Sequence, residues 1–366
     1  MQKAEGFRIL TAVRTLVLPA LLVVFALLSN LTLSSIATPL VSKQLLFFCL
    51  GGGIFYLVSK VSIKRMEQLS LLGYIATIFL LILTLAISLE TRNTSRWIDI
   101  FGFFRLQPSQ LAIPFVGLFA ATFIQNAPLA QGKNVLKLLG ILAVPAVLIL
   151  IEPDLGTTVV FLASMAPLFL LTKTRIEHIT LLIGGSLIVG LLTWAFVLQP
   201  YQKQRIFSFL DSSDTKGASY NAQQAMIAVG SGELFGRGLG QGVQSHLRFL
   251  PERQTDFIFA SFAEEFGFVG SLLLLLIYSG LCSFILYIGY QSNQKTAQLF
   301  CFICVTMIAI QAGVNIGMNM GIVPITGVTL PLLSYGGSSV LTISGCLGIL
   351  QSFVTAQKKE LTLHIS

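Results

Sequence analysis

Residues Leu16 to Leu33 read L-V-L-P-A-L-L-V-V-F-A-L-L-S-N-L-T-L, an apolar stretch without one charged side chain. An α-helix needs about 20 such residues to cross the hydrocarbon core of a bilayer. A cleaved signal peptide would have a shorter apolar stretch followed by a small-residue cleavage site, whereas this stretch ends in Ser and Thr residues. We therefore interpret it as a first membrane helix that is retained.

Nine further stretches of this kind follow, separated by charged residues or by Pro and Gly. The ten candidate helices are Leu16 to Leu33, Gln44 to Val61, Leu69 to Leu89, Pro108 to Gln125, Leu136 to Ile151, Leu155 to Thr172, Ile179 to Leu198, Phe266 to Tyr290, Ala297 to Met320 and Ser338 to Val354. The chain is 54% hydrophobic and only 10% charged, against roughly a quarter charged in soluble domains. This predicts an all-α polytopic membrane protein and excludes a water-soluble enzyme.

The distribution of Lys and Arg predicts the orientation of these helices, because short cytoplasmic loops carry an excess of both. With the N-terminus inside, 13 of the 23 basic residues are cytoplasmic and 10 are not. Six of those 10 lie in one long loop, residues 199–256, so the short loops divide 13 to four. We expect both termini in the cytoplasm, a large extracytoplasmic loop between helices 7 and 8, and one membrane domain spanning residues 1–366.

Composition excludes two further classes of function. The net charge of +8 follows from the cytoplasmic loops, and no exposed basic face with interleaved aromatics predicts nucleic-acid binding. All five Cys residues sit in apolar stretches. Cys301 and Cys304 form C-F-I-C, but without a second pair or polar flanks we favour buried hydrophobic residues over a zinc or redox site.

Four polar or broken segments lie near the outer ends of the predicted helices, where buried polar groups are costly unless they serve a purpose. In the first, Glu90 to Gln110, Arg96 and Arg105 alternate with aromatic residues. The segment is typical of an aromatic interface anchor that contacts lipid head groups, or of a site with cations for a phosphate-bearing substrate.

The second segment, E-P-D-L-G-T-T at Glu152 to Thr158, is a tight turn with two carboxylates. We favour Asp154 as the N-cap of the next helix, bonded to the N–H groups of Gly156 and Thr157. A role for Glu152 and Asp154 in binding a cation or holding an Arg is the alternative.

The third segment, Tyr220 to Gly267, contains six glycines between Gly230 and Gly242, with no preceding strand and no G-x-G-x-x-G spacing. A nucleotide-binding loop is therefore not expected. Its sharper feature is Glu252, Arg253 and Asp256, directly before an apolar stretch. If this part is helical, Glu252 and Asp256 share a face, with Asp256 at the boundary of water and an apolar wall. Such a carboxylate suits a general base, although an Arg-paired acid at a helix start is equally consistent.

The fourth segment, Gly321 to Ser339, is uncharged and interrupted by two Pro and three Gly residues. Such backbone is tolerated at membrane depth only when it is buried in protein or lines a wet cavity. We expect a functional re-entrant segment, with Ser334, Tyr335 and Ser338 as cavity candidates.

These segments together resemble the SEDS family, the shape, elongation, division and sporulation proteins of bacteria. The matching motifs are R-W-I-D-I with L-Q-P-S, E-P-D-L-G-T-T, Y-N-A-Q-Q with G-S-G-E-L-F-G-R-G-L-G-Q-G-V-Q-S, F-L-P-E-R-Q-T-D-F-I-F, and N-I-G-M-N-M-G-I-V-P-I-T-G-V-T-L-P-L-L-S-Y-G-G-S-S. They run from residue 96 to 339 in the family's order, and P-E-R before Q-T-D resembles the rod-shape branch more than the division branch.

The resemblance implies an inverting peptidoglycan glycosyltransferase that polymerises lipid II during cell elongation and rod-shape maintenance. It places the enzyme in the bacterial cytoplasmic membrane with its active face outward. The acid of the family's T-D-F-I-F motif corresponds to Asp256. In this mechanism the 4-hydroxyl of one lipid-linked GlcNAc attacks the anomeric carbon of a second glycan, which is bound to a polyprenyl chain through pyrophosphate.

On this basis we expect Asp256 to be the base, or the ligand of a divalent cation such as Mg or Mn. Arg253, Arg96 or Arg105 would neutralise the charge that develops on the pyrophosphate. The remaining substrate-site candidates are Glu152, Asp154, Glu252, Ser334, Tyr335 and Ser338.

This chain also departs from the family pattern. The family reads Q-P-S-E followed by A-K, whereas Gln110 and Ile113 stand at those positions, so an acid and a base are lost together. Neutral packing can replace a buried ion pair without loss of stability, and altered handling of the carrier lipid is the alternative. Gln254 stands where the family has His, which argues against a His proton acceptor there.

Two rival functions stay open at this stage. A lipid II flippase would place polar residues on broken helices near mid-membrane, whereas this chain gathers its acids on one side. A non-catalytic scaffold for a transpeptidase would leave Asp256 dispensable. The resemblance implies a class B penicillin-binding protein, other elongation-complex membrane proteins and membrane lipids as partners.

Overall fold

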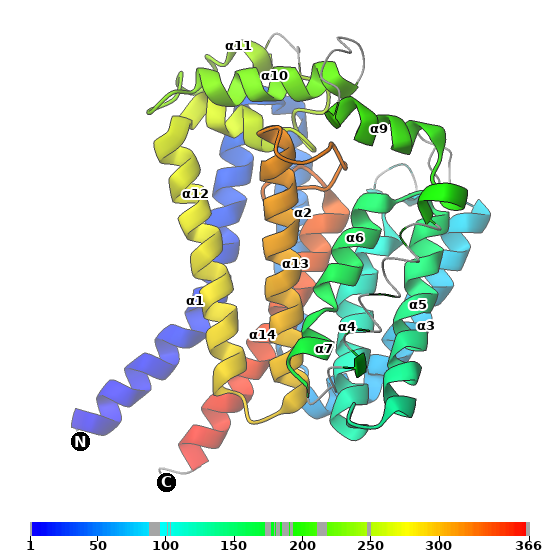
Figure 1. Ribbon diagram of the computed structural model, residues 1–366. Coiled ribbons are helices and arrows are strands. Elements are labelled where there is room, and N and C mark those ends of the chain that lie inside the picture. Colours follow the sequence, from blue (N-terminus) through cyan, green and yellow to red (C-terminus); the bar gives the residue numbers. More distant parts are fainter. Residues whose placement is uncertain are drawn as a thin grey trace.

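The computed structural model describes residues 2–87, 96–172, 193–210, 218–246 and 250–363, except Phe101 and Phe103, together with five single positions between 177 and 190. Figure 1 shows an elongated helical bundle with both chain termini at one end and helices α10 and α11 at the other. The common side of the termini agrees with the orientation expected from Lys and Arg.

The described elements are nearly all helical. They are α1 (Gln2–Ile36), the 3-10 turn η1 (Thr38–Leu40), α2 (Val41–Ser59), α3 (Ile63–Ile87), β1 (Ile98–Ile100), β2 (Phe104–Leu106), α4 (Pro108–Asn126), α5 (Gly132–Ile151), α6 (Leu155–Ser164), α7 (Pro167–Leu170), the π-turn η2 (Thr193–Val197), α9 (Pro200–Leu210), α10 (Ala218–Ser231), α11 (Val243–His246), α12 (Ile258–Gln291), α13 (Lys295–Asn319) and α14 (Gly337–Leu363).

Eight of these described helices are long and apolar enough to span a membrane. They correspond to eight of the ten predicted spans and confirm the all-α polytopic class. The predicted sixth span is instead divided into α6 and α7, because Pro167 has no N–H to continue the helix ladder. The predicted seventh span, Ile179 to Leu198, lies mostly outside the described residues.

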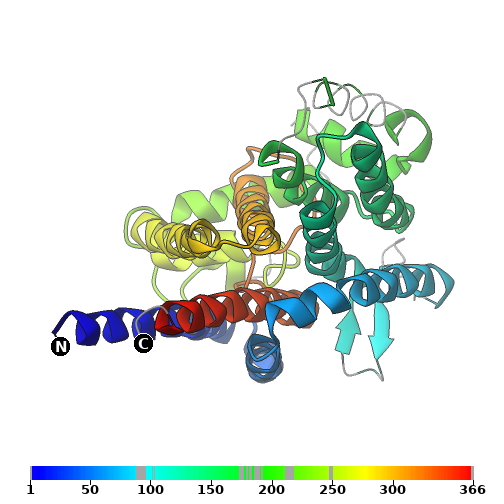
Figure 2. The ribbon, with the colours of Figure 1, turned by 90° about the horizontal axis from the view of Figure 1, so that it is seen from below.

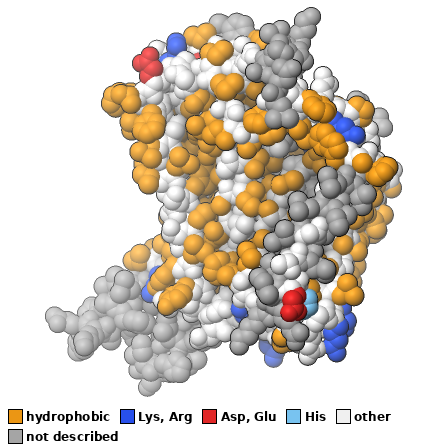
Figure 3. All heavy atoms as spheres, viewed as in Figure 1, with side chains coloured by type: hydrophobic (Ala, Val, Ile, Leu, Met, Phe, Trp, Pro, Cys, Tyr) orange, Lys and Arg blue, Asp and Glu red, His pale blue; other side chains and the backbone are white. Residues whose placement is uncertain are grey.

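Hydrophobic side chains cover the middle of the bundle in Figure 3, and the charged side chains seen in that view lie toward its two ends. Inside, large apolar residues are fully buried, among them Phe25, Phe161, Phe300 and Phe353. Helix α14 packs mainly against α2, α12 against α13, and α3 against α4, while α13 also contacts α4 and α6. The bundle thus has a protein core and an apolar outer surface suited to lipid.

Between α13 and α14 the chain runs without helix through residues 321–336, which we name the central segment. Leu330, Leu333 and Ser334 are at most 1% exposed, so this segment is buried in protein, as its sequence predicts. Its carbonyl groups find partners on neighbouring helices. Ser29 Oγ donates to Leu333 O at 2.8 Å, and Gln44 Nε2 donates to Ser334 O at 3.2 Å.

The predicted aromatic and basic segment before α4 contains a short antiparallel hairpin, in which Asp99 pairs with Arg105 in the strand register. Figure 2 shows both strands beside α3 at the edge of the bundle. These three-residue strands are the described exceptions to the all-α expectation.

Candidate functional site

Asp256 lies in the turns that precede α12, at the end of the bundle opposite the termini. Asn315 Nδ2 and Asn319 Nδ2 donate to the main-chain oxygen of Asp256 at 3.0 and 3.1 Å. A methyl group built on Gly327 would lie 3.6 Å from Asp256 Oδ2, so the half-buried carboxylate faces the central segment. Two buried asparagines of α13 therefore hold the main chain at Asp256 in place.

The central segment is also bonded to the residues just before Asp256. Ser334 Oγ donates to Thr255 O at 2.7 Å and accepts from Leu330 N at 2.9 Å. The backbone N–H of Tyr335 donates to Gln254 O at 2.9 Å. Ser334 is thus engaged in holding two stretches of irregular backbone together, and Tyr335 lies beside the stretch that leads to Asp256.

Glu252 and Asp256 do not lie on a helix, so the condition under which they would share a face is not met. Helix α12 begins only at Ile258, and Glu252 has a left-handed backbone with φ of 55°. Glu252 instead closes the turn: its Oε2 accepts from Thr255 Oγ1 at 3.2 Å. The apolar stretch does form a helix, but the helix begins at Ile258, and the residues before it form turns.

The E-P-D turn approaches the same place from another side. Asp154 is the N-cap of α6, as predicted, and accepts at 3.1 Å from Thr157 N, one of the two predicted partners. Its second oxygen accepts from Thr157 Oγ1 at 2.9 Å and from Gln107 Nε2 at 2.8 Å. Arg96 completes the shell with Nη1 3.4 Å from Asp154 Oδ1. Both oxygens of Asp154 are therefore fully used by the protein.

Glu152 has a different environment although it is two residues away. Its side chain is fully buried, and neither carboxyl oxygen has a hydrogen-bond partner among the described residues. Burial, with the Asp154 charge as a second cause and Arg96 opposing both, raises the pKa of Glu152 to about 9. This carboxyl group is neutral at pH 7.

Close packing brings the E-P-D turn and the central segment together. A methyl group on Gly156 would lie 3.0 Å from Thr326 O and 2.9 Å from Val328 Cγ2. Thr326 and Val328 flank Gly327, the residue toward which the Asp256 carboxylate is directed. The absence of a side chain at Gly156 thus permits the acid turn to reach the surroundings of Asp256.

The hairpin forms the third side. Ser338 Oγ donates to Arg105 O and accepts from Gln107 N, both at 2.9 Å. The Arg105 side chain is 60% exposed, and its Nε lies 3.8 Å from Asp99 Oδ2. Arg105 is therefore available to an anion, whereas Arg96 is turned inward to Asp154 and to Pro153 O at 2.9 Å.

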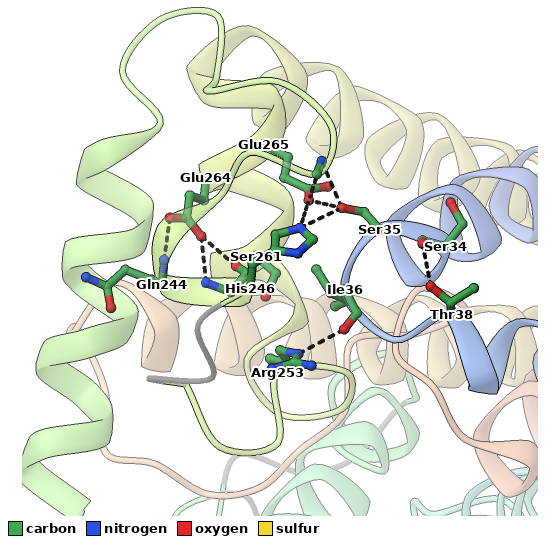
Figure 4. A network of polar contacts seen from close by, with 12 residues as sticks. Ser34, Ser35, Ile36, Thr38, Gln244, His246, Arg253, Ser261, Glu264 and Glu265 are labelled. Carbon is green, nitrogen blue, oxygen red and sulfur yellow. Dashed lines mark hydrogen bonds and ion pairs between the residues drawn. The ribbon is translucent and has the colours of Figure 1, made fainter.

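The glycine loop docks on the start of α12 through its main chain. Arg237 N donates to Glu264 O at 2.9 Å and Gly238 N to Glu265 O at 3.1 Å. Figure 4 shows Glu264 beside Gln244, Glu265 beside His246 and Ser35, and Arg253 beside Ile36. Arg253 Nε donates to Ile36 O at 3.0 Å. The loop and Arg253 thus fasten the Asp256 turn to the outer end of α1.

An apolar groove of about 480 Å³ lies between α2, α3, α4 and α14. At one end, Leu106 and Leu341 adjoin the hairpin and Ser338, and Val61 and Met66 lie toward the other end. Sixteen residues line the groove, of which only Ser70 and Thr342 carry a polar side-chain atom other than sulfur. Its shape and chemistry suit a hydrocarbon chain.

The structure thus gathers the predicted segments into one site. It also adds residues that sequence reasoning missed: Gln107, Asn315 and Asn319. Their signal was weak but present, since two amides four residues apart in an apolar helix are costly unless bonded. Gln110, at the position of the family's acid, donates through Nε2 to Gln107 Oε1 at 2.9 Å and so joins the Asp154 shell through neutral groups.

A divalent cation would have few protein ligands here. Among the described residues no three His, Cys, Asp or Glu side chains converge on one point. Mg²⁺ is often held by one or two carboxylates together with substrate phosphates and water. Asp256 fits that arrangement, whereas the saturated Asp154 does not.

Comparisons with known proteins agree with this geometry. The family model for FtsW, RodA and SpoVE, described as cell cycle protein, matches residues 7–359. The peptidoglycan glycosyltransferase MrdB of Escherichia coli K12 is 37% identical over 289 residues, which cover 78% of this chain and 77% of MrdB. A probable peptidoglycan glycosyltransferase FtsW of Pseudomonas fluorescens is 34% identical over 317 residues, 84% of this chain and 77% of that protein.

Solved structures show the same fold. A chain of a peptidoglycan synthase complex that coordinates polymerization and crosslinking is 27% identical, with a TM-score of 0.81 over 93% of this chain and 97% of that one. The rod shape determining protein RodA of Thermus thermophilus is 25% identical, with a TM-score of 0.70 over 93% of this chain and 97% of RodA.

Proposed function

This chain belongs to the SEDS family of cell cycle proteins, the family of FtsW, RodA and SpoVE, and we propose that it is a peptidoglycan glycosyltransferase that polymerises lipid II during elongation. The observation that carries the proposal is the position of Asp256. It stands where the central segment, the E-P-D turn and the start of α12 meet, at the outer end of a bundle with an apolar groove.

We assign Asp256 the role of general base. It accepts the proton of the acceptor's 4-hydroxyl as that oxygen bonds to the anomeric carbon of the donor. The bond from that carbon to the polyprenyl pyrophosphate breaks, and the pyrophosphate leaves with the electron pair. One displacement inverts the anomeric configuration, so one base and a stabilised leaving group are sufficient.

Substrate binding divides between the groove and the polar end. The groove would take part of the polyprenyl chain, and exposed Arg105 is the described cation best placed for pyrophosphate. In the alternative role, Asp256 would hold a divalent cation such as magnesium, which would stabilise charge on the pyrophosphate. Arg96, Glu152 and Asp154 act from behind this surface, because all three are turned toward protein.

The proposed location is the bacterial cytoplasmic membrane, with the active end outside. The termini lie at the opposite end (Figure 1), where the Lys and Arg count predicts the cytoplasm. A class B penicillin-binding protein is the proposed partner, since the similar synthase complex couples polymerization with crosslinking. Other elongation-complex membrane proteins and membrane lipids are further proposed partners.

The test is polymerisation of purified lipid II, scored by gel, with and without the transpeptidase partner. Asp256→Asn keeps the side-chain shape and should lower the rate by about 100-fold or more, the usual contribution of a general base. Glu233→Gln removes an exposed acid at the same end and should leave the rate unchanged. Full activity of Asp256→Asn would refute the assignment, and transport without polymerisation would favour a flippase.

A further inference from the structure

Helix α9 differs from the membrane-spanning helices in composition and direction. Residues Thr193 to Leu210, which contain η2 and α9, include four aromatic residues besides Tyr201, two basic residues and no acid. In Figure 1, α9 lies across the end of the bundle that carries α10 and α11 rather than along the bundle. A short basic and aromatic helix in this orientation is typical of a membrane interface.

Contacts with the E-P-D turn fix the position of α9 relative to the end of the membrane helix α5. Gln202 Nε2 donates to Pro153 O at 3.0 Å, and the Tyr201 hydroxyl lies 3.4 Å from the same oxygen. Pro153 is two residues beyond Ile151, the last residue of the membrane helix α5. Ile151 is 54% exposed, so the lipid-facing surface of α5 extends to the level at which α9 is attached.

The α9 surface, as we name it, consists of Trp194, Phe196, Lys203 and Phe207, together with Arg205, which leaves the other face of α9 beside Tyr201. Phe196 is 83% exposed and Phe207 is 56% exposed. The Trp194 and Phe207 rings are 5.8 Å apart, and Lys203 Nζ lies 5.9 Å from the Trp194 ring centre. In a bilayer, an exposed Phe suits the acyl chains, a Trp ring suits the interface, and a Lys above that ring suits the head-group phosphates.

Arg96 and Arg105, near the hairpin, have acidic partners. Arg96 is bound to Asp154 and Pro153, and Arg105 faces Asp99. Lys203 and Arg205 have aromatic neighbours instead, since Arg205 lies 5.8 Å from the Tyr201 ring centre. An all-positive surface with exposed aromatic rings at the edge of the lipid-facing bundle complements anionic head groups.

We propose that the α9 surface binds anionic phospholipid of the outer leaflet, with its aromatic rings among the upper acyl chains and Lys203 and Arg205 at the head-group phosphates. Because α9 is attached to Pro153, bound lipid holds the E-P-D turn at the membrane interface. This contact concerns bulk phospholipid and is independent of the identity of the glycan substrate.

Tryptophan fluorescence can test the depth of this surface, because the chain has two Trp residues. Trp97→Phe leaves Trp194 as the single reporter in the full-length protein. In nanodiscs, spin labels at the head group or upper acyl chain should quench Trp194 strongly, and labels near the bilayer centre or aqueous acrylamide should quench it weakly. If Trp97→Phe does not fold, the difference between the wild type and Trp194→Phe gives the same signal.

Charge is tested by titrating phosphatidylglycerol into the detergent-solubilised protein while Trp194 emission is followed. Lys203→Gln and Arg205→Gln should each raise the half-saturating lipid concentration by about fivefold. The matched control is Lys133→Gln with Lys137→Gln, which removes two charges at the opposite end of the bundle and should not change it. Phosphatidylcholine should bind the wild type as weakly as phosphatidylglycerol binds the double variant.

Two results would overturn the proposal. Quenching of Trp194 by acrylamide but by no lipid label would show that the surface faces water or a protein partner. An equal response to phosphatidylglycerol in the wild type and in the Lys203/Arg205 double variant would show that these cations do not bind anionic lipid.

Discussion

Glu152 and Asp154, two residues apart, show how strongly hydrogen-bond partners affect the protonation of a buried carboxyl group. Asp154 accepts hydrogen bonds from Thr157 and Gln107 and forms an ion pair with Arg96, so both of its oxygens have partners. Glu152 is fully buried without a hydrogen-bond partner among the residues that the structure describes. Desolvation without compensation favours the neutral form of an acid. The E-P-D turn therefore combines one charged anchor with one neutral carboxyl group.

This difference predicts a pH dependence of stability. The pKa of Glu152 is raised from 4.5 to about 9 in the folded protein. Its contribution to stability is therefore complete below pH 4.5 and is lost as the pH rises toward 9, because only the unfolded chain releases the proton. Between pH 5 and pH 9 we expect the wild type to lose unfolding free energy relative to Glu152→Gln, on the order of several kcal/mol. Its thermal midpoint should fall accordingly.

Thermal unfolding of the purified proteins in detergent at several pH values measures this difference. The two proteins should have similar midpoints near pH 5, where the wild-type carboxyl group is protonated in both states. Parallel curves for the two proteins across the whole range would contradict the burial of an uncompensated acid at this position.

The loop before α11 can pack against α12 only because glycines stand at the points of contact. Gly236 has φ of 81°, and a methyl group there would lie 2.0 Å from Glu265 O. Gly267 lies inside α12 with φ of 66°, and a methyl group on it would lie 2.2 Å from Gly236 N. The two backbones approach so closely that neither position has room for a side chain. The kink at Gly267 and the loop thus form one packed unit.

Gly236→Ala and Gly240→Ala separate backbone strain from steric contact. Both glycines have a left-handed backbone, with φ of 81° and 76°, but a methyl group on Gly240 meets nothing within 4 Å. Gly240→Ala should cost only the left-handed conformation, about 1–2 kcal/mol. Gly236→Ala must also move the loop and should expose residues 232–246 to limited proteolysis. Equal proteolysis of both variants would contradict the close approach.

The polar end of the bundle carries Asp256 and Arg105, and the apolar groove between α2, α3, α4 and α14 reaches Leu106 of the hairpin. Such a combination suits a substrate with a charged head and a long hydrocarbon tail, which is what the proposed function requires.

Filling the groove should weaken substrate binding without touching the polar end. Gly345 lines the groove, where a methyl group would lie 3.8 Å from Ile54 Cγ2. Gly345→Leu should raise KM for lipid II by about tenfold, with little change in kcat. A tenfold change corresponds to the binding free energy of roughly two buried methylene groups of the tail. Gly53→Leu on α2 is the control, since nothing lies within 4 Å of that position. A normal KM for Gly345→Leu would exclude the groove as the tail site.

Local sequence was sufficient to predict the membrane class, the approximate spans, the common side of the termini and the N-cap at Asp154. These properties depend on local composition, because each helix must be apolar along its length and each cap bonds within one turn. The motifs also identified the family and singled out Asp256, although the role of that residue remains a proposal. The sequence did not determine the break in the sixth span or the turn at Glu252.

The packing of the whole chain determines which polar groups compensate one another. Gln107 reaches Asp154 across 47 positions, Asn315 reaches Asp256 across 59, and Ser29 reaches Leu333 across 304. Such partners cannot be found from local patterns, because buried donors and acceptors are paired by packing over the whole chain. The same packing left Glu152 neutral, turned Arg96 inward and attached α9 to Pro153.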